Sequence, residues 1–328
     1  PTNDVVSYYK RRAEAEVGLI ITEGVEVSHK ASSAYPNVPR LDSKKARDGW
    51  KRVVGGIKEH NGAVIAQLWH CGGFRKLGMA PNPEVPGHTA SGLVRPGKRV
   101  AHAMSSDDIK ETIDAFASDA KHCEEIGFDG VEIHGAHGYL IDNFFWRGTN
   151  EREDLYGGYI EKRSQLAANI VKAIRSNVSN NFIVGLRFSQ WKQQDYEAKL
   201  AASSEELLKV IKQPVDAGLD YLHSSMRRFW ESEFEGSDEN LAFWTKKLTG
   251  LPTISVGSVG LDSDFIDMSA PASPRNIDKA ISDISNKKYD MVAVGRALLA
   301  DYEWVIKMRE GRIKDIIPYT KEALYKLY

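Results

Sequence analysis

The chain has 328 residues, of which 42% are hydrophobic and 27% charged, a composition typical of a globular protein. With 44 Lys and Arg against 45 Asp and Glu, it carries a formal net charge of -1, which excludes the basic footprint of a protein that binds nucleic acid or an anionic membrane. Its two cysteines, Cys71 and Cys123, are too few for a disulfide scaffold or a four-cysteine iron–sulfur or zinc site. No apolar run approaches the ~20 residues that cross a bilayer, and no signal-peptide pattern opens the sequence, so we expect a cytoplasmic protein.

In chain order, the apolar pattern predicts helices that alternate with short strands. Helices are indicated by apolar residues that recur on one face, as Trp50, Val53 and Ile57 do. The predicted helices cover residues 5–16, 43–59, 105–126, 161–178, 204–217, 274–285 and 297–309. The predicted strands cover residues 17–24 (centred on 19–21), 63–69, 131–133, 182–188, 220–223, 253–256 and 291–294.

This alternation implies a parallel sheet covered by helices, and the length suits an α/β barrel of roughly 250 residues plus insertions. We therefore expect the α/β class and a (β/α)₈ TIM barrel, as a single domain over residues 1–328. Because seven strands are predicted and a closed barrel of this type needs eight, we expect the first barrel strand to precede Pro1 and to be absent from the given sequence. Residues 71–104 and 224–250 are interpreted as long loop insertions.

The stretch Gly130–Tyr139, GVEIHGAHGY, places two imidazoles and a phenol where a strand ends. In parallel α/β proteins this end of a strand carries the chemistry. His134 and His137 are three residues apart, a spacing that a metal could use, but no HExxH helix pattern accompanies them, so we expect no metal. Tyr139, with an ordinary pKa of ~10, is protonated at neutral pH and can donate a proton.

Strand alternation brings further polar residues toward the same mouth. Gln67, His134 and Arg187 all lie near carboxyl ends of predicted strands, and we expect them to surround one cavity. This set suits a planar, hydrogen-bonding and partly anionic ligand better than a bare metal. The alternative is that each is a hydrogen-bonded polar residue of the barrel core.

Two glycine sites follow late apolar strands, in ISVGSVG and VAVGRAL. Backbone N–H groups after the seventh and eighth barrel strands form the common phosphate site of this architecture, and a nearby arginine adds a charge partner. No GxGxxG motif opens a βαβ unit, which disfavours a Rossmann domain. The candidate phosphate-binding residues are Gly257, Ser258, Gly295 and Arg296.

The block GVEIHGAHGYLIDNFFWRGTNEREDLYGG, with QLWH before it and GLRFS, VGSVG and VAVGRALLAD after it, resembles the Old Yellow Enzyme family of FMN-dependent ene-reductases. The resemblance covers nearly the whole chain. It departs from the family at the first barrel strand, whose backbone and Thr or Cys side chain normally contact the flavin and do not appear here.

The resemblance implies an FMN site. Gln67 and Arg187 are expected to contact the isoalloxazine ring, and Gly24 to line its edge. The same resemblance assigns the phosphate to the two late glycine sites.

For the substrate, the resemblance implies that His134 and His137 donate hydrogen bonds to a carbonyl oxygen. Tyr139 is expected to protonate the carbon alpha to that carbonyl, and Trp69 to line the substrate site.

The expected function is therefore the reduction, by NADH or NADPH through FMN, of the C=C bond of an enone-type small molecule. One alternative is an incomplete or non-catalytic flavin-binding barrel, since the first strand is missing. Another is a different FMN barrel such as a 2-hydroxyacid oxidase, which is disfavoured because that chemistry needs a base and Tyr139 suits an acid. No nucleic acid or membrane partner is expected, and the oligomeric state is left open, a homo-oligomer included.

Overall fold

All seven predicted strands form one sheet among residues 1–264, 271–275 and 277–327, which the computed structural model describes. Each strand pairs with the next of the seven along the chain, in the order β1-β2-β7-β8-β9-β10-β11. The β2–β7, β7–β8 and β10–β11 pairs are parallel, as strand–helix alternation predicts. The strands are β1 (Leu19–Glu26), β2 (Ala63–Trp69), β7 (Gly130–His137), β8 (Ile183–Lys192), β9 (Tyr221–Ser225), β10 (Thr253–Val256) and β11 (Met291–Val292).

Two compact units share the chain. Unit 1 comprises Pro1–Ile20, Gly49–Val64 and His223–Tyr328, and unit 2 comprises Ile21–Asp48 and Ile65–Leu222. The expectation of a single domain over residues 1–328 stays a prediction.

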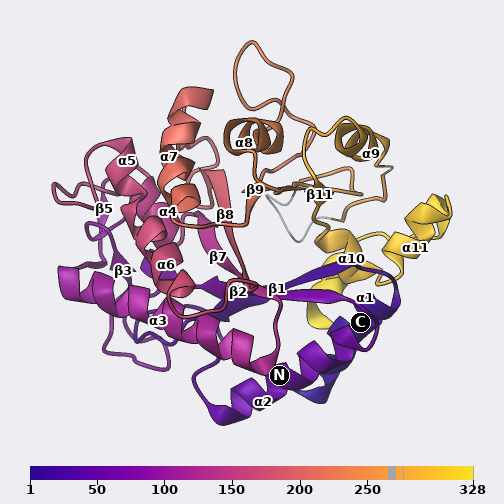
Figure 1. The fold of residues 1–328 in the computed structure, drawn as a ribbon, viewed down its shortest axis with the longest axis horizontal. Helices are drawn as coiled ribbons and strands as arrows, with labels where there is room; N and C mark the ends of the chain where they lie inside the picture. Colours follow the sequence, from indigo (N-terminus) through magenta and orange to yellow (C-terminus); the bar gives the residue numbers. More distant parts are fainter. Residues whose placement is uncertain (265–270, 276, 328) are drawn as a thin grey trace. The chain divides into compact units, whose positions relative to one another are not determined.

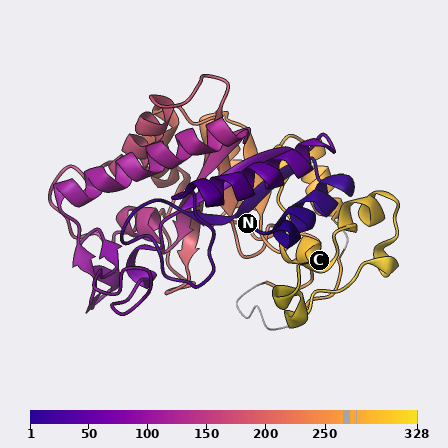
Figure 2. The same ribbon diagram turned by 90° about the horizontal axis from the view of Figure 1, so that it is seen from below.

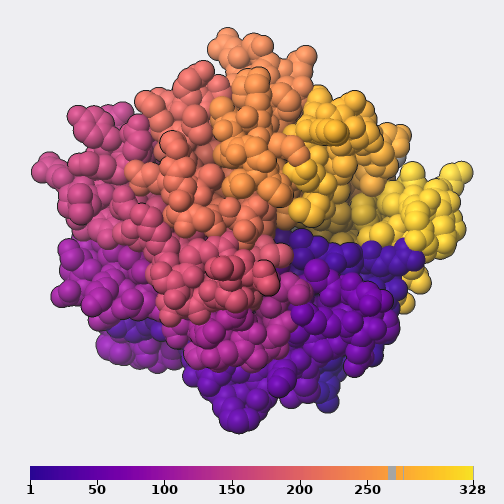
Figure 3. Space-filling view, viewed as in Figure 1, coloured from indigo at the N-terminus to yellow at the C-terminus, as the bar shows by residue number. Residues whose placement is uncertain are grey.

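In unit 2, helices follow β7 and β8 and pack against them. All eight residues of β7 are buried. The space-filling view in Figure 3 shows the side chains on the outer face of the molecule in the direction of Figure 1. Helices α3 and α6 lie side by side (Figures 1 and 2), and the cap of α3 follows from its SSDD start. Ser105 and Asp108 form a capping box there, in which the Asp108 N–H donates to Ser105 Oγ at 3.2 Å. The helices of this unit are α3 (Ser106–Ile126), α4 (Leu140–Phe145), α5 (Ile160–Arg163), α6 (Gln165–Arg175) and α7 (Ser204–Asp216).

In unit 1, the buried side of α2 (Lys44–Lys58) is the predicted one. Trp50 is fully buried and packs against Tyr9 of α1 (Asn3–Glu14), with ring centroids 6.1 Å apart. The later elements are α8 (Leu241–Thr249), α9 (Asp278–Ser285), α10 (Arg296–Ala300), α11 (Trp304–Arg309), η2 (Ile313–Asp315) and η3 (Lys321–Tyr325). None of the described helices is both long and apolar enough to cross a lipid bilayer.

The 71–104 insertion is more ordered than the sequence predicts. Its strands are too short to show a period. Arg75 anchors the stretch of chain before the first of them by donating to the carbonyls of Ser33 at 2.7 Å and Val85 at 2.9 Å. Its elements are η1 (Gly72–Phe74), a parallel pair of β3 (His88–Thr89) with β6 (His102–Ala103), and an antiparallel pair of β4 (Leu93–Arg95) with β5 (Lys98–Arg99).

Several element boundaries also differ from the prediction. The 224–250 stretch contains α8, which begins at an Asn240 cap and ends at Gly250 in the left-handed conformation. The helix predicted over 161–178 is divided into α5 and α6, and the one over 297–309 into α10 and α11. The strand β7 continues to His137, beyond the predicted 131–133, with a register irregularity between Gly135 and His137.

Candidate active site

A row of three residues crosses the middle of the sheet in unit 2. Gln67 of β2 is the register partner of Glu132 of β7, which in turn pairs with Gly185 of β8. The Gln67 amide Nε2 donates to Glu132 Oε1 at 2.7 Å, and both side chains are buried. Because a carboxylate can only accept here, this contact orients the amide and leaves Gln67 Oε1 as an acceptor.

Glu132 is held from the other side by a phenol. The Tyr221 hydroxyl donates to Glu132 Oε2 at 3.0 Å, and burial raises the Tyr221 pKa well above its ordinary value, with the Glu132 charge adding to the effect. A Cβ atom at Gly185 would overlap the Tyr221 ring. Glycine at 185 is therefore what allows this phenol to reach the carboxylate.

The next pair of register partners along β7 and β8 consists of an arginine and the first of the two histidines. Arg187 of β8 is the register partner of His134 of β7. Burial lowers the pKa of the Arg187 guanidinium, and the negative charge of Glu132 opposes that shift. An arginine remains charged under these conditions, so a partly buried positive charge lies next to the Gln67–Glu132 row.

The end of β7 brings the two histidines and the tyrosine together. The ring centroids of His134 and His137 are 5.1 Å apart, and those of His134 and Tyr139 are 5.2 Å apart. His137 has a φ of 64°, in the left-handed region, and its N–H donates to Ser189 Oγ at 2.9 Å. This backbone turn lets His137 and Tyr139 return toward His134 instead of continuing the strand.

The Tyr139 hydroxyl lies between two polar neighbours that the sequence analysis did not identify. It is 3.2 Å from the Tyr35 hydroxyl, and Gln193 Nε2 donates to it at 3.0 Å. Burial, followed by the Tyr35 hydroxyl, raises the Tyr139 pKa, whereas the Gln193 contact lowers it. The net shift is upward, so Tyr139 is a protonated acid throughout the physiological pH range.

Aromatic rings surround this group. Trp69 stacks on Tyr35 with centroids 5.5 Å apart and meets Tyr139 edge-on at 4.9 Å. A Cβ atom at Gly24 would lie 2.6 Å from Trp69 Cε3, so glycine at 24 permits this position of the indole. Trp191 stacks on His137 with centroids 4.5 Å apart. The pairing of β7 with β8 shifts register between Phe188 and Lys192, so alternation along the strand could not have identified Trp191.

Beneath the His137–Tyr139 turn lies an ion pair that is fully buried. Lys192 Nζ is 2.8 Å from Asp142 Oδ1, and Asp142 Oδ2 accepts from the Gly138 N–H at 2.6 Å. Burial raises the Asp142 pKa to about 6 and lowers that of Lys192. The pair thus fastens the turn that carries His137 and Tyr139 to the end of β8.

The predicted phosphate residues lie in unit 1. Arg296 Nη2 donates to Ser258 Oγ at 3.3 Å and to the Ser263 carbonyl at 2.6 Å, and burial lowers the Arg296 pKa. Ser258 has a φ of 52°. A Cβ atom at Gly257 would lie 2.8 Å from the Met226 carbonyl oxygen, whereas a Cβ atom at Gly295 would have no atom of the described residues within 4 Å. The structure brings Ser258 and Arg296 together at the start of α10.

Comparisons with known proteins point in one direction. The sequence profile of the NADH:flavin oxidoreductase / NADH oxidase family matches residues 1–315. An NADH oxidase of Thermoanaerobacter brockii is 31% identical over 322 residues, which are 95% of this chain and 46% of that protein, so the chain spans about half its length. A probable NADH-dependent flavin oxidoreductase of Bacillus subtilis is 30% identical over 319 residues, with 95% of this chain and 81% of that protein covered.

Among solved structures, an old yellow enzyme homologue from Zymomonas mobilis superimposes with a TM-score of 0.80 at 23% sequence identity. The match covers 99% of this chain and 87% of that one. The predicted TIM-barrel fold is therefore confirmed.

Proposed function

Because the chain belongs to the NADH:flavin oxidoreductase / NADH oxidase family, a family of FMN-dependent enzymes, we propose that it uses NADH or NADPH to reduce the C=C bond of α,β-unsaturated carbonyl compounds. FMN, when bound, supplies the hydride transfer. The residues of the chain bind and orient the reactants and move the proton.

The buried row in unit 2 fits an isoalloxazine ring. Gln67 Oε1, left as an acceptor by the Glu132 contact, can receive a hydrogen bond from an imide N–H. The Arg187 guanidinium would stabilise negative charge at the N1/C2 end of the reduced ring. Gly24 would line the edge of the ring beside Trp69, where a side chain has no room.

The donor set in unit 1 fits a phosphate. Ser258 and Arg296 offer a hydroxyl and a guanidinium, and Gly257 and Gly295 offer backbone N–H groups. Such charge-assisted contacts favour a phosphate dianion over a neutral group. We assign this set to the FMN phosphate.

One observation carries the substrate assignment. The Tyr139 phenol, whose pKa is raised, has its ring centroid 5.2 Å from that of His134, and the His134 centroid is 5.1 Å from that of His137. His134 and His137 are the two imidazoles able to donate to a carbonyl oxygen. These donors would stabilise the negative charge that develops on that oxygen during reduction. Tyr139 would then give its proton to the alpha carbon, and Trp69 would contact the substrate.

The test is a half-reaction experiment. FMN-loaded protein is reduced anaerobically with NADPH, and in parallel with NADH, and is then mixed with cyclohexenone while the flavin absorbance is followed. Reoxidation by the enone is the expected result. Flavin that is reduced but is not reoxidised by any member of a panel of enones would rule out the proposed substrate class.

The alternatives lead to other outcomes. An incomplete barrel would purify colourless and take up no added FMN. A 2-hydroxyacid oxidase needs a base where the substrate binds, a role that the raised pKa of Tyr139 does not suit. The cytoplasmic localisation and a homo-oligomeric state stay predictions.

A further inference from the structure

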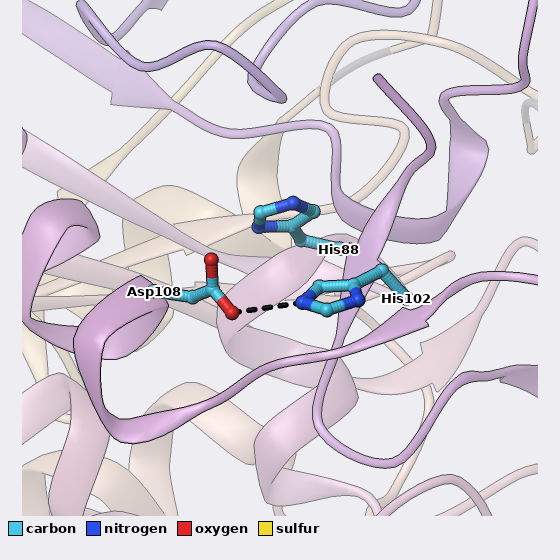
Figure 4. Close-up of side chains that lie close together, drawn as sticks. All are labelled: His88, His102 and Asp108. Atoms are coloured by element: carbon cyan, nitrogen blue, oxygen red, sulfur yellow. Dashed lines mark hydrogen bonds and ion pairs between the residues drawn. The ribbon is translucent and has the colours of Figure 1, made fainter. Parts of the chain in front are cut away.

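The 71–104 insertion brings two histidines next to the start of α3 (Figure 4). His88, His102 and Asp108, here termed the His88 cluster, each offer one ligand atom, and these three atoms lie within 4.8 Å of one another. Their spacings of 14 and 6 residues match no metal-binding motif. The sequence alone therefore does not indicate that these three side chains meet, and no metal was expected.

The local fold explains how the cluster forms. His88 of β3 and His102 of β6 are register partners in a parallel pair, and their ring centroids are 4.8 Å apart. Asp108 is the third residue of α3, and the capping box with Ser105 fixes its position. In Figure 4, His102 Nε2 and Asp108 Oδ2 are joined at 2.8 Å, and the His88 ring lies beside this pair.

His88 has a polar atom that the surrounding protein does not satisfy. Its side chain is 3% exposed, and within the described residues its Nδ1 has no hydrogen-bond partner. A neutral imidazole carries a lone pair on one of its two nitrogens. A buried nitrogen without a partner costs free energy and calls for an unseen ligand or ion.

The neighbouring histidines do not supply that partner. His70 Nδ1 accepts from the Gly72 N–H at 3.1 Å, so its proton is on Nε2, which donates to His29 Nδ1 at 3.0 Å. His29 Nδ1 also accepts from the Ala31 N–H at 3.2 Å, which places the His29 proton on Nε2. His29 therefore presents an N–H and no lone pair, and it is not a fourth metal ligand.

We propose that the His88 cluster binds one divalent transition-metal ion, with Zn²⁺ as the best match, through His88, His102 and one oxygen of Asp108. Two imidazoles with a carboxylate are a common zinc donor set, and three protein ligands leave the fourth position to water. On binding, the ion occupies the lone pair of His102 Nε2, and the remaining ring proton lies on Nδ1.

An ion could reach this cluster from solvent, and once bound it would link the insertion to α3. The His102 side chain is 42% exposed, so an ion can reach the site from solvent. Bound there, it joins β3 and β6 of the insertion to the first turn of α3. We expect it to stiffen the insertion, whose residue Phe74 packs on Tyr139 with centroids 4.5 Å apart.

The experiment uses the full chain after chelator treatment and dialysis. Calorimetric titration with Zn²⁺ should give one site per chain with micromolar or tighter affinity, and excess Mg²⁺ should not compete because it prefers oxygen ligands. Saturating Zn²⁺ should also raise the melting temperature, as a ligand that binds the folded state does. His102→Gln should weaken binding at least about tenfold and abolish the melting shift.

The matched control is His122→Gln. His122 is a partly exposed histidine of α3, the helix that carries Asp108, and its Nδ1 lies 3.4 Å from Asp119 Oδ1. This variant should bind Zn²⁺ as the wild type does. Melting curves in EDTA establish that each variant is folded. Wild-type protein without a Zn²⁺ site, or equal binding in His102→Gln, would overturn the proposal.

Discussion

Gln193 Nε2 donates a hydrogen bond to the Tyr139 hydroxyl oxygen at 3.0 Å, across 54 positions of sequence. A phenol that accepts this bond keeps its own proton available for donation. The amide would then stabilise the phenolate that the proposed proton transfer leaves behind, since its contact lowers the Tyr139 pKa.

We expect Tyr139→Phe to slow flavin reoxidation by cyclohexenone by about 10²- to 10⁴-fold, the usual contribution of a positioned acid. Flavin reduction by NADPH needs no such proton and should change little. Gln193→Met should slow reoxidation by about 3- to 10-fold, the equivalent of one neutral hydrogen bond. Anaerobic stopped-flow absorbance measures both half-reactions. Equal slowing of the two in Tyr139→Phe would contradict the role of Tyr139 as proton donor.

A second prediction follows from the φ of 64° at His137. Asparagine tolerates the left-handed region and its amide N–H can donate, whereas alanine offers no donor and costs about 1–2 kcal/mol in that conformation. His137→Asn should keep the reoxidation rate within about tenfold of wild type, and His137→Ala should lose about 10²- to 10³-fold. If the two variants are equally slow, the ring itself matters and not the donated hydrogen bond.

A third prediction concerns the buried pair of Lys192 and Asp142. Lys192→Met leaves the carboxyl without its cation, so the Asp142 pKa, already raised to about 6 by burial, should rise further above the ~3.9 of the unfolded chain. Between these two values the folded state binds more protons than the unfolded state, so the free energy of unfolding falls as the pH rises. We expect a loss of about 3–5 kcal/mol at pH 8 and a smaller loss at pH 5, measured by urea unfolding.

Lys121→Met is the control for that experiment. Lys121 pairs with Glu124 at 2.8 Å on the surface, so its removal should cost less than about 1 kcal/mol. A loss in Lys192→Met that does not change with pH would show that Asp142 does not titrate in this range.

The fourth prediction tests the close approach at Gly185. The added methyl group of Gly185→Ala would overlap the Tyr221 ring, and we expect a loss of about 1–3 kcal/mol in the free energy of unfolding. In a Tyr221→Ser background the same change should cost far less, because the two positions are coupled. Gly55→Ala, exposed on α2 with open space around it, should instead stabilise the protein by about 0.5–1 kcal/mol. Additive losses at 185 and 221 would disprove the steric explanation.

Features of the fold and the site that depend on residues close together in the sequence could be predicted, whereas those that depend on distant contacts could not. Alternation along single strands was sufficient to put Gln67, His134 and Arg187 on faces that the register brings into neighbouring rows. The helix α8 was not predicted, although its Asn240 cap and final Gly250 are readable signals, because its nine residues are too few to show a clear helical period.

Other features leave no local trace. Asp142 and Lys192 lie 50 positions apart, and nothing in either segment marks its charge as buried or as the partner of the other. Tyr35 follows a polar loop, yet its hydroxyl lies beside that of Tyr139. Such pairs are set by how strands and loops pack in three dimensions, which periodicity does not encode.

The stacking of Trp191 on His137 has a consequence for anyone who would engineer this chain. With His137 in its proposed role as a donor to the substrate, exchanging this indole to admit a bulkier molecule would also release the imidazole from its position. A substitution at position 191 would therefore change both substrate selectivity and turnover rate. A library that varies Trp191 together with its stacking neighbour Tyr196 explores combinations that single-site variation cannot reach.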